Sequence, residues 1–341
     1  IYHIFISDVQ QQQLDINLAQ ELSGTKHEAK RQWQVTSRAM NHRETSGRTA
    51  NLRNADIELY EINGKYIWSK KSFESVSGGV VHQDTLEQVK LADGNEEVPW
   101  VSKESIEAFS QLNWVNKNSQ YLLGIRIQND SNFGFHSALR ISGMNNILFK
   151  EHKLKLRYGI GQGYRVPTLK ERFYEFDHSS LGYKVYGNEN LAPETSITAN
   201  TNLSYENSID NSFIGNFDLN SDINVFYTQA KDLIDTIADP EQSIIEALDI
   251  SVYTNIDEAI LKGFNWSLKT TYSQWVNQLN YSYISAKNSD GNHLEGRPTH
   301  QVKASIGYNS DQNKLNSMLY LVYQKGEAVP AEGYKNGTLN N

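Results

Sequence analysis

The sequence predicts an all-β fold, built as an antiparallel meander of roughly fifteen strands. The main observation is the alternation of apolar and polar residues, and the clearest run sets Phe217, Leu219, Ile223 and Val225 against Asp218, Asn220, Asp222 and Asn224. A second observation is that short turns and long loops alternate along the chain. A transmembrane β-barrel has short turns on one side of the membrane and long loops on the other. We therefore expect an antiparallel transmembrane meander β-barrel.

The first half of the chain carries alternating runs separated by polar stretches. We expect strands close to residues 4–7, 14–19, 32–39, 56–59 and 73–82. The Asn63-Gly64 pair is typical of a hairpin turn. The polar stretch of residues 84–103, which contains Pro99, indicates a long loop.

The second half alternates more regularly. We expect strands close to residues 106–114, 121–127, 135–142, 154–163, 197–205, 216–227, 252–260, 263–272, 275–284, 302–308 and 315–323. Residues 116–118 and the Asn145-Asn146 pair indicate short turns, whereas Asp239-Pro240 indicates a longer loop.

Composition limits the classes of function. The 341-residue chain has a formal net charge of −8, so we expect no binding to nucleic acid. It contains no cysteine, which excludes disulfides and thiolate metal ligands. No window approaches the ~18 consecutive apolar residues of a transmembrane helix. The mean hydropathy of −0.60 suits strands that turn one apolar face to outer-membrane lipid and one polar face to a lumen.

One long loop joins two clearly alternating strands. The first strand ends in Tyr164-Arg165-Val166-Pro167, and the second begins after residues 187–194, Gly-Asn-Glu-Asn-Leu-Ala-Pro-Glu. Pro167 and Pro193 both lie where a strand meets the loop, because proline lacks the N–H that a sheet requires. The loop is therefore framed by two proline-containing strand ends.

The residues of this loop do not predict an enzyme. Asp177-His178-Ser179 has the letters of a catalytic triad, but neighbours in sequence cannot form the hydrogen-bond chain of a triad, and no Gly-x-Ser-x-Gly turn is present. We expect no catalytic residues, no cofactor and no metal centre. The loop carboxylates Glu171, Glu175, Asp177 and Glu194 are expected to bind Arg165 and Arg172 or to face the lumen.

Two motifs at the ends of this loop resemble those of one family. Tyr164, Arg165 and Pro167, followed by Glu171, resemble the FRAP box of TonB-dependent outer-membrane receptors, with Val166 in place of the usual Ala. The second motif resembles the NPNL-PE box of the same family, with Glu189 in place of Pro, and its residues are Asn188, Leu191, Pro193 and Glu194. Residues 108–114, 124–126, 137–140, 253–256 and 296–300 also resemble strands of the family barrel. In that family the two boxes lie on consecutive strands, joined by a long extracellular loop that meets the ligand.

The resemblance implies that residues 1–341 form an incomplete barrel domain with about fifteen of twenty-two strands. The plug domain with its TonB-contacting segment would be absent. Residues 1–6 lack an initiator Met and a signal peptide, and residues 336–341 lack the terminal aromatic of the family. We therefore expect the chain to be a fragment.

The resemblance also implies a function. We expect energised uptake of an iron chelate, either a siderophore or haem, across a Gram-negative outer membrane, with the TonB–ExbB–ExbD complex as partner. The alternatives are a cobalamin or glycan importer of the same family, and a passive porin or barrel adhesin. Because haem receptors of the family carry a histidine between the two boxes, His178 is a candidate ligand-binding residue, with Tyr174, Tyr183 and Tyr186 beside it. The alternative is an exposed loop histidine without a specific role.

Overall fold

The computed structural model contains sixteen strands and two short helices in its described part. It describes residues 5–22, 29–48, 52–91, 94–149, 152–179, 182–211, 215–294, 296–310 and 315–326, so residues 1–4 and the C-terminal residues 336–341 lie outside it. All sixteen strands belong to one sheet. Neither described helix is long and apolar enough to cross a membrane.

Fourteen of the strands are long and follow one another along the sheet. They are β1 (Phe5–Leu22), β2 (Lys30–Arg48), β3 (Arg53–Lys70), β4 (Phe73–Lys90), β5 (Glu96–Val115), β6 (Ser119–Asp130), β7 (Gly134–Phe149), β8 (His152–Arg165), β11 (Glu194–Asn211), β12 (Gly215–Ala238), β13 (Asp249–Tyr272), β14 (Trp275–Asn288), β15 (His300–Ser310) and β16 (Leu315–Lys325). Between β8 and β11 lie α1 (Leu169–Phe173), β9 (Glu175–His178) and β10 (Tyr183–Tyr186), and α2 (Pro240–Glu246) lies between β12 and β13.

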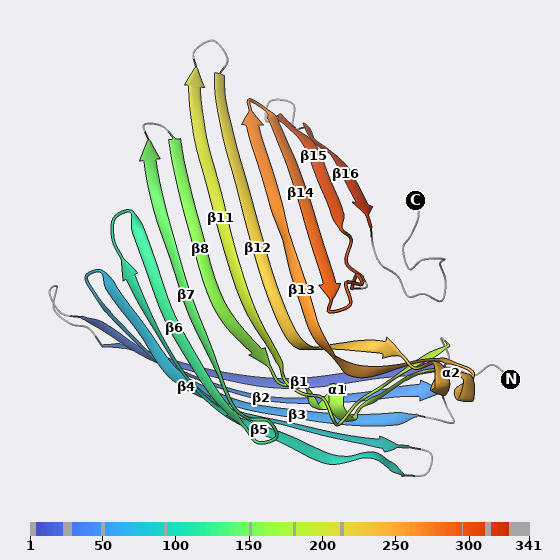
Figure 1. Cartoon of the computed structure of the whole chain (residues 1–341). Coiled ribbons are helices and arrows are strands. Elements are labelled where there is room, and N and C mark those ends of the chain that lie inside the picture. The colour runs from blue at the N-terminus through green and yellow to red at the C-terminus, as the bar shows by residue number, and fades with distance from the viewer. Residues whose placement is uncertain are drawn as a thin grey trace.

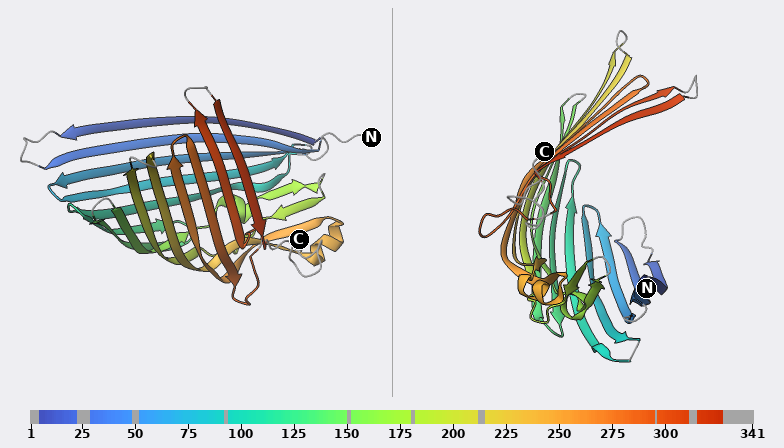
Figure 2. Two further views of the ribbon diagram at one scale, coloured as in Figure 1. Left: turned by 90° about the horizontal axis from the view of Figure 1, so that it is seen from above. Right: turned by 90° about the vertical axis from the view of Figure 1, so that its right-hand side faces the viewer.

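The long strands form an antiparallel meander in which each pairs with the next. Figure 1 shows the sheet curving and twisting, so that its N-terminal strands run across the direction of its C-terminal strands. Figure 2 shows the same sheet as an open, curved wall. Within the described residues, β1 pairs only with β2 and β16 only with β15. The all-β meander and the partial barrel predicted from the sequence are therefore confirmed.

The two ends of the wall differ in the length of their connections. At one end, which we call the turn end, residues 71–72, 116–118 and 273–274 join neighbouring strands. At the opposite end, which we call the loop end, residues 166–193, 239–248 and 289–299 do so. From β8 onward this difference confirms the predicted asymmetry of turns and loops, whereas residues 131–133 join β6 to β7 at the loop end by a turn as short as those at the turn end.

Several predicted breaks lie inside strands instead. Asn63 and Gly64 pair with Val80 and Gly79 in the middle of β3, so the predicted turn there is wrong. Residues 5–7 of the first predicted run and the run at 14–19 share β1, whereas residue 4 lies outside the described residues. The runs at 252–260 and 263–272 share β13, and Asn145-Asn146 lies within β7. Beyond the apolar part of a strand both faces are polar, so the alternation fades although the backbone pairing continues.

The predicted long loop at residues 84–103 is also wrong. β4 continues to Lys90 and β5 starts at Glu96. Pro99 lies where the β4–β5 register shifts, between the pairs Leu86–Val101 and Gln88–Val98. A bulge tolerates proline because a bulged residue need not donate its N–H to the neighbouring strand.

The strand register separates an apolar face from a polar face. Ile62, Val81 and Ile106 are register partners on β3, β4 and β5, and they are 56%, 54% and 64% exposed. Their neighbours Glu61 and His82 lie on the opposite face, where His82 Nδ1 is 3.5 Å from a Glu61 carboxylate oxygen. The apolar side chains therefore form an exposed outer face, and the polar ones form the inner face on which the loops pack.

This division predicts opposite outcomes for two substitutions on β12. Val225 belongs to the exposed apolar face, and Asn220 has the opposite parity on the same strand. An arginine that faces lipid at the bilayer midplane costs roughly 2–4 kcal/mol. We expect Val225→Arg to reduce the yield of receptor folded into lipid bilayers, measured by the shift in electrophoretic mobility on heating, and Asn220→Arg to leave the yield near the unsubstituted value. Equal yields for the two variants would contradict this assignment of faces.

Candidate functional site

Arg165 connects the two strands that carry the long loop. Arg165 ends β8 and is the register partner of Glu194, which begins β11. Its guanidinium donates two hydrogen bonds to Glu194, at 2.9 and 2.7 Å, and two to Glu171, at 2.9 and 2.8 Å. Paired, charge-assisted bonds of this kind are strong and fix geometry. We call Arg165, Glu171 and Glu194 the clasp, because they hold the beginning and the end of the loop together.

Local sequence places Glu171 in the clasp. Thr168 caps α1: its hydroxyl accepts the backbone N–H of Glu171 at 3.1 Å, and a Glu171 carboxylate oxygen accepts the backbone N–H of Thr168 at 2.8 Å. This is a capping box, which satisfies two N–H groups at the start of a helix. Pro167 is buried directly before it. The same carboxylate therefore caps the helix and binds Arg165.

The second motif attaches the end of the loop to β13. Asn188 donates a side-chain hydrogen bond to the backbone oxygen of Tyr253 at 3.0 Å, and its backbone N–H donates to the backbone oxygen of Glu171 at 2.9 Å. Leu191 is buried, and Pro193 directly precedes β11. At the other end of the loop, the ring of Tyr164 stacks on His136 with centroids 5.3 Å apart. The motif residues thus serve to position the loop.

Two ionic groups tie β9 to the wall strands and β10 to α2. Arg53, on β3, donates to Asp177 at 2.6 Å and to Glu175 at 3.3 Å, and also pairs with Glu97. Lys184, on β10, lies 2.8 Å from Glu246 of α2. The expectation that the loop carboxylates bind Arg165 and Arg172 thus holds for Glu171 and Glu194, but Glu175 and Asp177 bind Arg53.

Arg172 instead lies over two aromatic rings, at 5.2 Å from the centroid of Phe133 and 4.7 Å from that of Phe173. Arg53 and Asp177 are 124 residues apart in sequence. No local pattern signals such a pair.

The structure separates the four predicted ligand residues. His178 and Tyr183 are register partners on β9 and β10, their ring centroids are 4.9 Å apart, and Tyr183 is 38% exposed. Tyr174 is only 2% exposed and packs with Leu169 against the wall, and burial raises its pKa to about 12. Tyr186 donates its hydroxyl to Glu246 at 2.8 Å. His178 and Tyr183 therefore form one pair, whereas Tyr174 is a packing residue in this structure and Tyr186 contacts α2. Ligand contact by any of the four remains a prediction.

A polar hollow of about 560 Å³ lies on the inner face beside the clasp. Its lining includes Glu61, His82, Lys103, Glu107, Arg126 and Tyr164, as well as Arg165. Arg126 and Glu107 form an ion pair at 2.6 Å within it. This wall can hydrogen-bond a polar solute, and in the described part of the chain no group of three or more His, Asp or Glu residues is arranged to hold a metal ion.

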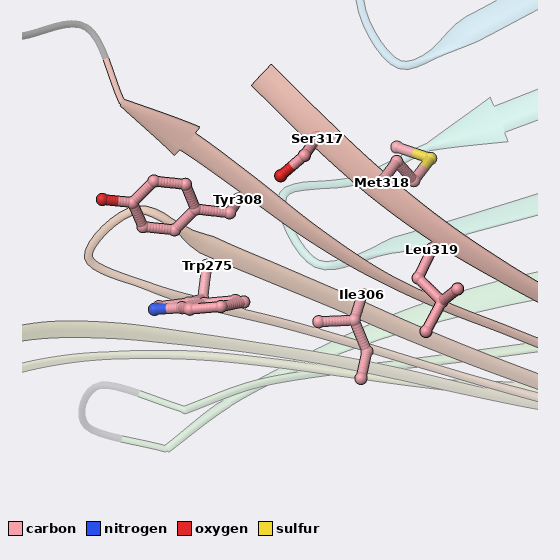
Figure 3. Close-up of a pocket in the computed structure, with 6 residues that line it drawn as sticks. All are labelled: Trp275, Ile306, Tyr308, Ser317, Met318 and Leu319. Atoms are coloured by element: carbon pink, nitrogen blue, oxygen red, sulfur yellow. The ribbon is translucent and has the colours of Figure 1, made fainter. Parts of the chain in front are cut away.

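A second hollow, of about 570 Å³, has a different character. It lies on β14, β15 and β16 and is lined by Trp275, Ile306, Tyr308, Ser317, Met318 and Leu319 (Figure 3). Trp275 and Tyr308 project from neighbouring strands with ring centroids 4.9 Å apart. Its lining carries no charged side chain, so it belongs to the exposed apolar face rather than to a site for a charged solute.

The clasp predicts a specific effect of Arg165→Lys. An ammonium group cannot make the paired bonds of a guanidinium to both carboxylates. We expect local opening of the loop to become easier by about 1–3 kcal/mol, the range for hydrogen bonds to charged groups, measured as faster amide exchange in residues 168–174. Arg157→Lys is the control, because Arg157 is on the same strand but, among the described residues, its guanidinium donates to the uncharged side chains of Asn202 and Ser204. Equal exchange in both variants would contradict the role of the clasp.

The clasp also predicts a dependence on pH. Burial alone would raise the pKa of Glu171, but hydrogen bonds from Arg165 and Thr168 outweigh it and hold the pKa below its ordinary value of 4.5. The ionised carboxylate therefore stabilises the loop fully above about pH 4.5, and this contribution is lost as the pH falls through the lowered pKa. We expect amide exchange in the loop to accelerate on such acidification in the unsubstituted receptor and to change less in Glu171→Gln. Identical pH profiles for the two proteins would exclude Glu171 as the titrating group.

Comparison with known proteins agrees with this architecture. A family model described as TonB dependent receptor-like, beta-barrel matches residues 9–339. The iron-regulated outer membrane virulence protein of Vibrio cholerae serotype O1 is 27% identical over 224 residues, which cover 62% of this chain and 32% of that protein.

Solved structures show the same fold at low sequence identity. A double mutant of the Serratia marcescens haemophore receptor HasR, in complex with its haemophore HasA and haem, has a TM-score of 0.71 and 13% identity over 94% of this chain and 59% of that chain. The siderophore receptor PirA of Pseudomonas aeruginosa has a TM-score of 0.58 and 15% identity over 92% and 63%. The copper transporter OprC has a TM-score of 0.64 and 14% identity over 89% and 51%.

The chain spans less than two thirds of the length of each of these proteins. The match of the family model nevertheless covers nearly the whole chain, and the antiparallel meander agrees with it. The family consists of transporters and receptors rather than enzymes. The chain therefore belongs to the TonB-dependent receptor family, and its sheet is a β-barrel wall of the bacterial outer membrane.

Proposed function

We propose that the full-length receptor takes up an iron chelate, either a siderophore or haem, across the outer membrane, with energy from the TonB–ExbB–ExbD complex. The observation that carries the proposal is the family match over residues 9–339. Iron as the transported metal is supported by the relative from Vibrio cholerae, which is named as iron-regulated. It is also supported by structural neighbours named as a haemophore receptor and a siderophore receptor.

The proposed mechanism involves binding and passage without covalent chemistry. Loops at the loop end capture the chelate, and the polar inner face offers hydrogen bonds along the path. Contact with the TonB–ExbB–ExbD complex would occur through a plug domain elsewhere in the full-length protein. The aromatic pair His178 and Tyr183 is the candidate for first contact, because it combines an imidazole with an exposed ring at the loop end.

The chemistry of the chelate distinguishes the two proposed cargoes. Haem iron has axial positions that an imidazole nitrogen can fill. In a siderophore complex, oxygen ligands already saturate the iron, so a loop offers only hydrogen bonds and aromatic contact. His178 would therefore be essential for haem and dispensable for a siderophore.

Growth of a receptor-deletion strain on single iron sources tests the proposal most directly. Loss of growth on one source, restored by the gene, supports iron uptake and identifies the chelate. Unchanged growth on all sources would contradict the proposal and favour a cobalamin or glycan importer, or a passive porin or adhesin. The similarity to a copper transporter shows that the fold alone does not select the cargo.

We expect His178→Ala in the full-length receptor to abolish haem-dependent growth and to shift the Soret band of bound haem, while growth on siderophore iron continues. The control is His293→Ala, because His293 is an exposed histidine in another connection at the loop end. Unchanged haem binding in His178→Ala would remove His178 from the site and favour the siderophore.

A further inference from the structure

β9 and β10 together span the inner side of the sheet at the loop end. β9 contacts β3, β4 and β5 through its own side chains and those just before it. β10 pairs with β13. Because β4 to β8, β11 and β12 separate β3 from β13 along the sheet, a segment that touches both must cross the concave side. In Figure 1 these yellow-green strands run from α1 towards α2. We call β9 and β10 the crossbar.

One end of the crossbar is anchored in a buried cluster. Leu169 and Tyr174 pack against Ala55, Leu86 and Val98 of the wall, and all five side chains are buried. Phe176 packs against the same cluster. Arg53 adds its bonds to Glu175 and Asp177, and its side chain is also buried. Separating this end would expose an apolar core and leave buried charges unpaired, and both changes are costly.

The other end of the crossbar is held by strand pairing and by one ionic group, rather than by a buried apolar cluster. Tyr183 to Tyr186 pair in parallel with Asp249 to Val252, at a point on β13 that β14 does not reach, because β14 pairs only from Ala259 onward. One carboxylate on α2 completes this attachment: Glu246 accepts hydrogen bonds from Lys184 and Tyr186, both at 2.8 Å. None of the residues of α2, all of which are described, is buried. Ile250, the register partner of Lys184, is buried, but it belongs to neither buried apolar cluster of the described residues. Separation at this end therefore disturbs one buried apolar side chain rather than a cluster of five.

We propose that the crossbar is a gate across the mouth of the barrel, permanently anchored at β3 to β5 and releasable at β13, with Glu246 as its latch. A solute that enters from the loop end meets the crossbar before it reaches the polar inner face. Passage requires the β10–β13 pairing and the Lys184–Glu246 bond to separate, while the Arg53 end stays in place. For the uptake proposed above, the gate would open when cargo binds at Tyr183, the exposed residue of β10.

The carboxylate of Glu246, the latch, stays ionised over the pH range in which the receptor works. Hydrogen bonds from Lys184 and then Gln242 lower the pKa of Glu246 to about 2. The Asp239 carboxylate accepts a hydrogen bond from the backbone N–H of Gln242 at 3.0 Å, and the Ser243 hydroxyl accepts one from the backbone N–H of Ile250 at 2.9 Å. These two bonds hold α2 in place. Acidification of the medium therefore does not open the gate, and release must come from competition for Lys184 or from mechanical displacement.

Limited trypsin digestion of the full-length receptor in outer-membrane vesicles tests which end releases. We expect Glu246→Gln to accelerate cleavage after Lys184 about tenfold, because the freed strand separates from β13 more often. Cleavage after Arg172, at the anchored end, should remain slow in the same sample. Glu241→Gln is the matched control, because Glu241 is exposed on the first turn of the same helix. Unchanged cleavage after Lys184, or faster cleavage after Arg172, would overturn the assignment of latch and anchor.

A disulfide across the releasable end tests the gate itself. Residues 1–341 contain no native cysteine, so Val185→Cys with Ser251→Cys, which are register partners, introduces one possible bridge within this part of the receptor. We expect the oxidised double variant to lose uptake of radioiron-labelled haem and of a radioiron-labelled catecholate chelate by about tenfold or more, and a reductant to restore it. Val185→Cys alone should transport normally in either redox state.

The two experiments separate the gate from its cargo. Equal uptake by the oxidised and reduced double variants would overturn the gate. If the unsubstituted receptor transports neither probe, the proposed function fails, and the digestion experiment still decides whether β10 is held by Glu246.

Discussion

The structure of the loop end depends on one guanidinium. Arg165 sits at the last position of β8, and its bonds to Glu194 and Glu171 join the end of one strand, the start of the next and the first turn of α1. Without this connection, the loop between β8 and β11 would be held by its packing on the wall, by the ion pairs of Arg53 and Lys184, and by the pairing of β10 with β13, but its two ends would not be joined to each other. Because Glu171 is also the capping residue of α1, the direction in which the loop leaves β8 follows from the same carboxylate. The clasp therefore aims α1 and β9 inward, across the polar face.

The wall itself is built on a simple division of faces. Alternation along each strand places Ile62, Val81 and Ile106 on the exposed outer face and sends polar side chains inward. The inner face is polar at the level of the hollow beside the clasp but becomes apolar near the loop end, where Ala55, Leu86 and Val98 receive Leu169 and Tyr174. This local change in the character of one face gives the long loop a docking surface, and it explains why α1 and β9 lie against the wall instead of extending away from it.

The sequence predicted the site unevenly. The motif residues lie at the two ends of the loop, as the sequence predicted, because proline ends a strand. The capping box of Thr168 and Glu171 is equally local, but the helix that it caps was not predicted from the sequence. Tyr174 and Tyr183 looked equivalent in the sequence, yet one is in the core and the other is exposed. The ion pairs of Arg53 with loop carboxylates could not be predicted from neighbouring residues, because its partners lie in other elements, up to 124 residues away.

The sequence by itself determined the all-β class, the order of the strands and the family. The reason is that alternation with a period of two and short motifs are both local patterns, which can be identified from neighbouring residues alone. It also assigned the outward and inward faces, since neighbouring positions on a strand point to opposite sides. Only the tertiary structure decided which strands extend past their apolar region, that β10 pairs in parallel with β13, and that Lys184 forms an ion pair with Glu246. Those contacts join residues far apart in sequence. They exist because the sheet curves enough for β9 to contact β3 while β10 pairs with β13. This curvature is a property of the whole sheet, so no single segment of sequence predicts it.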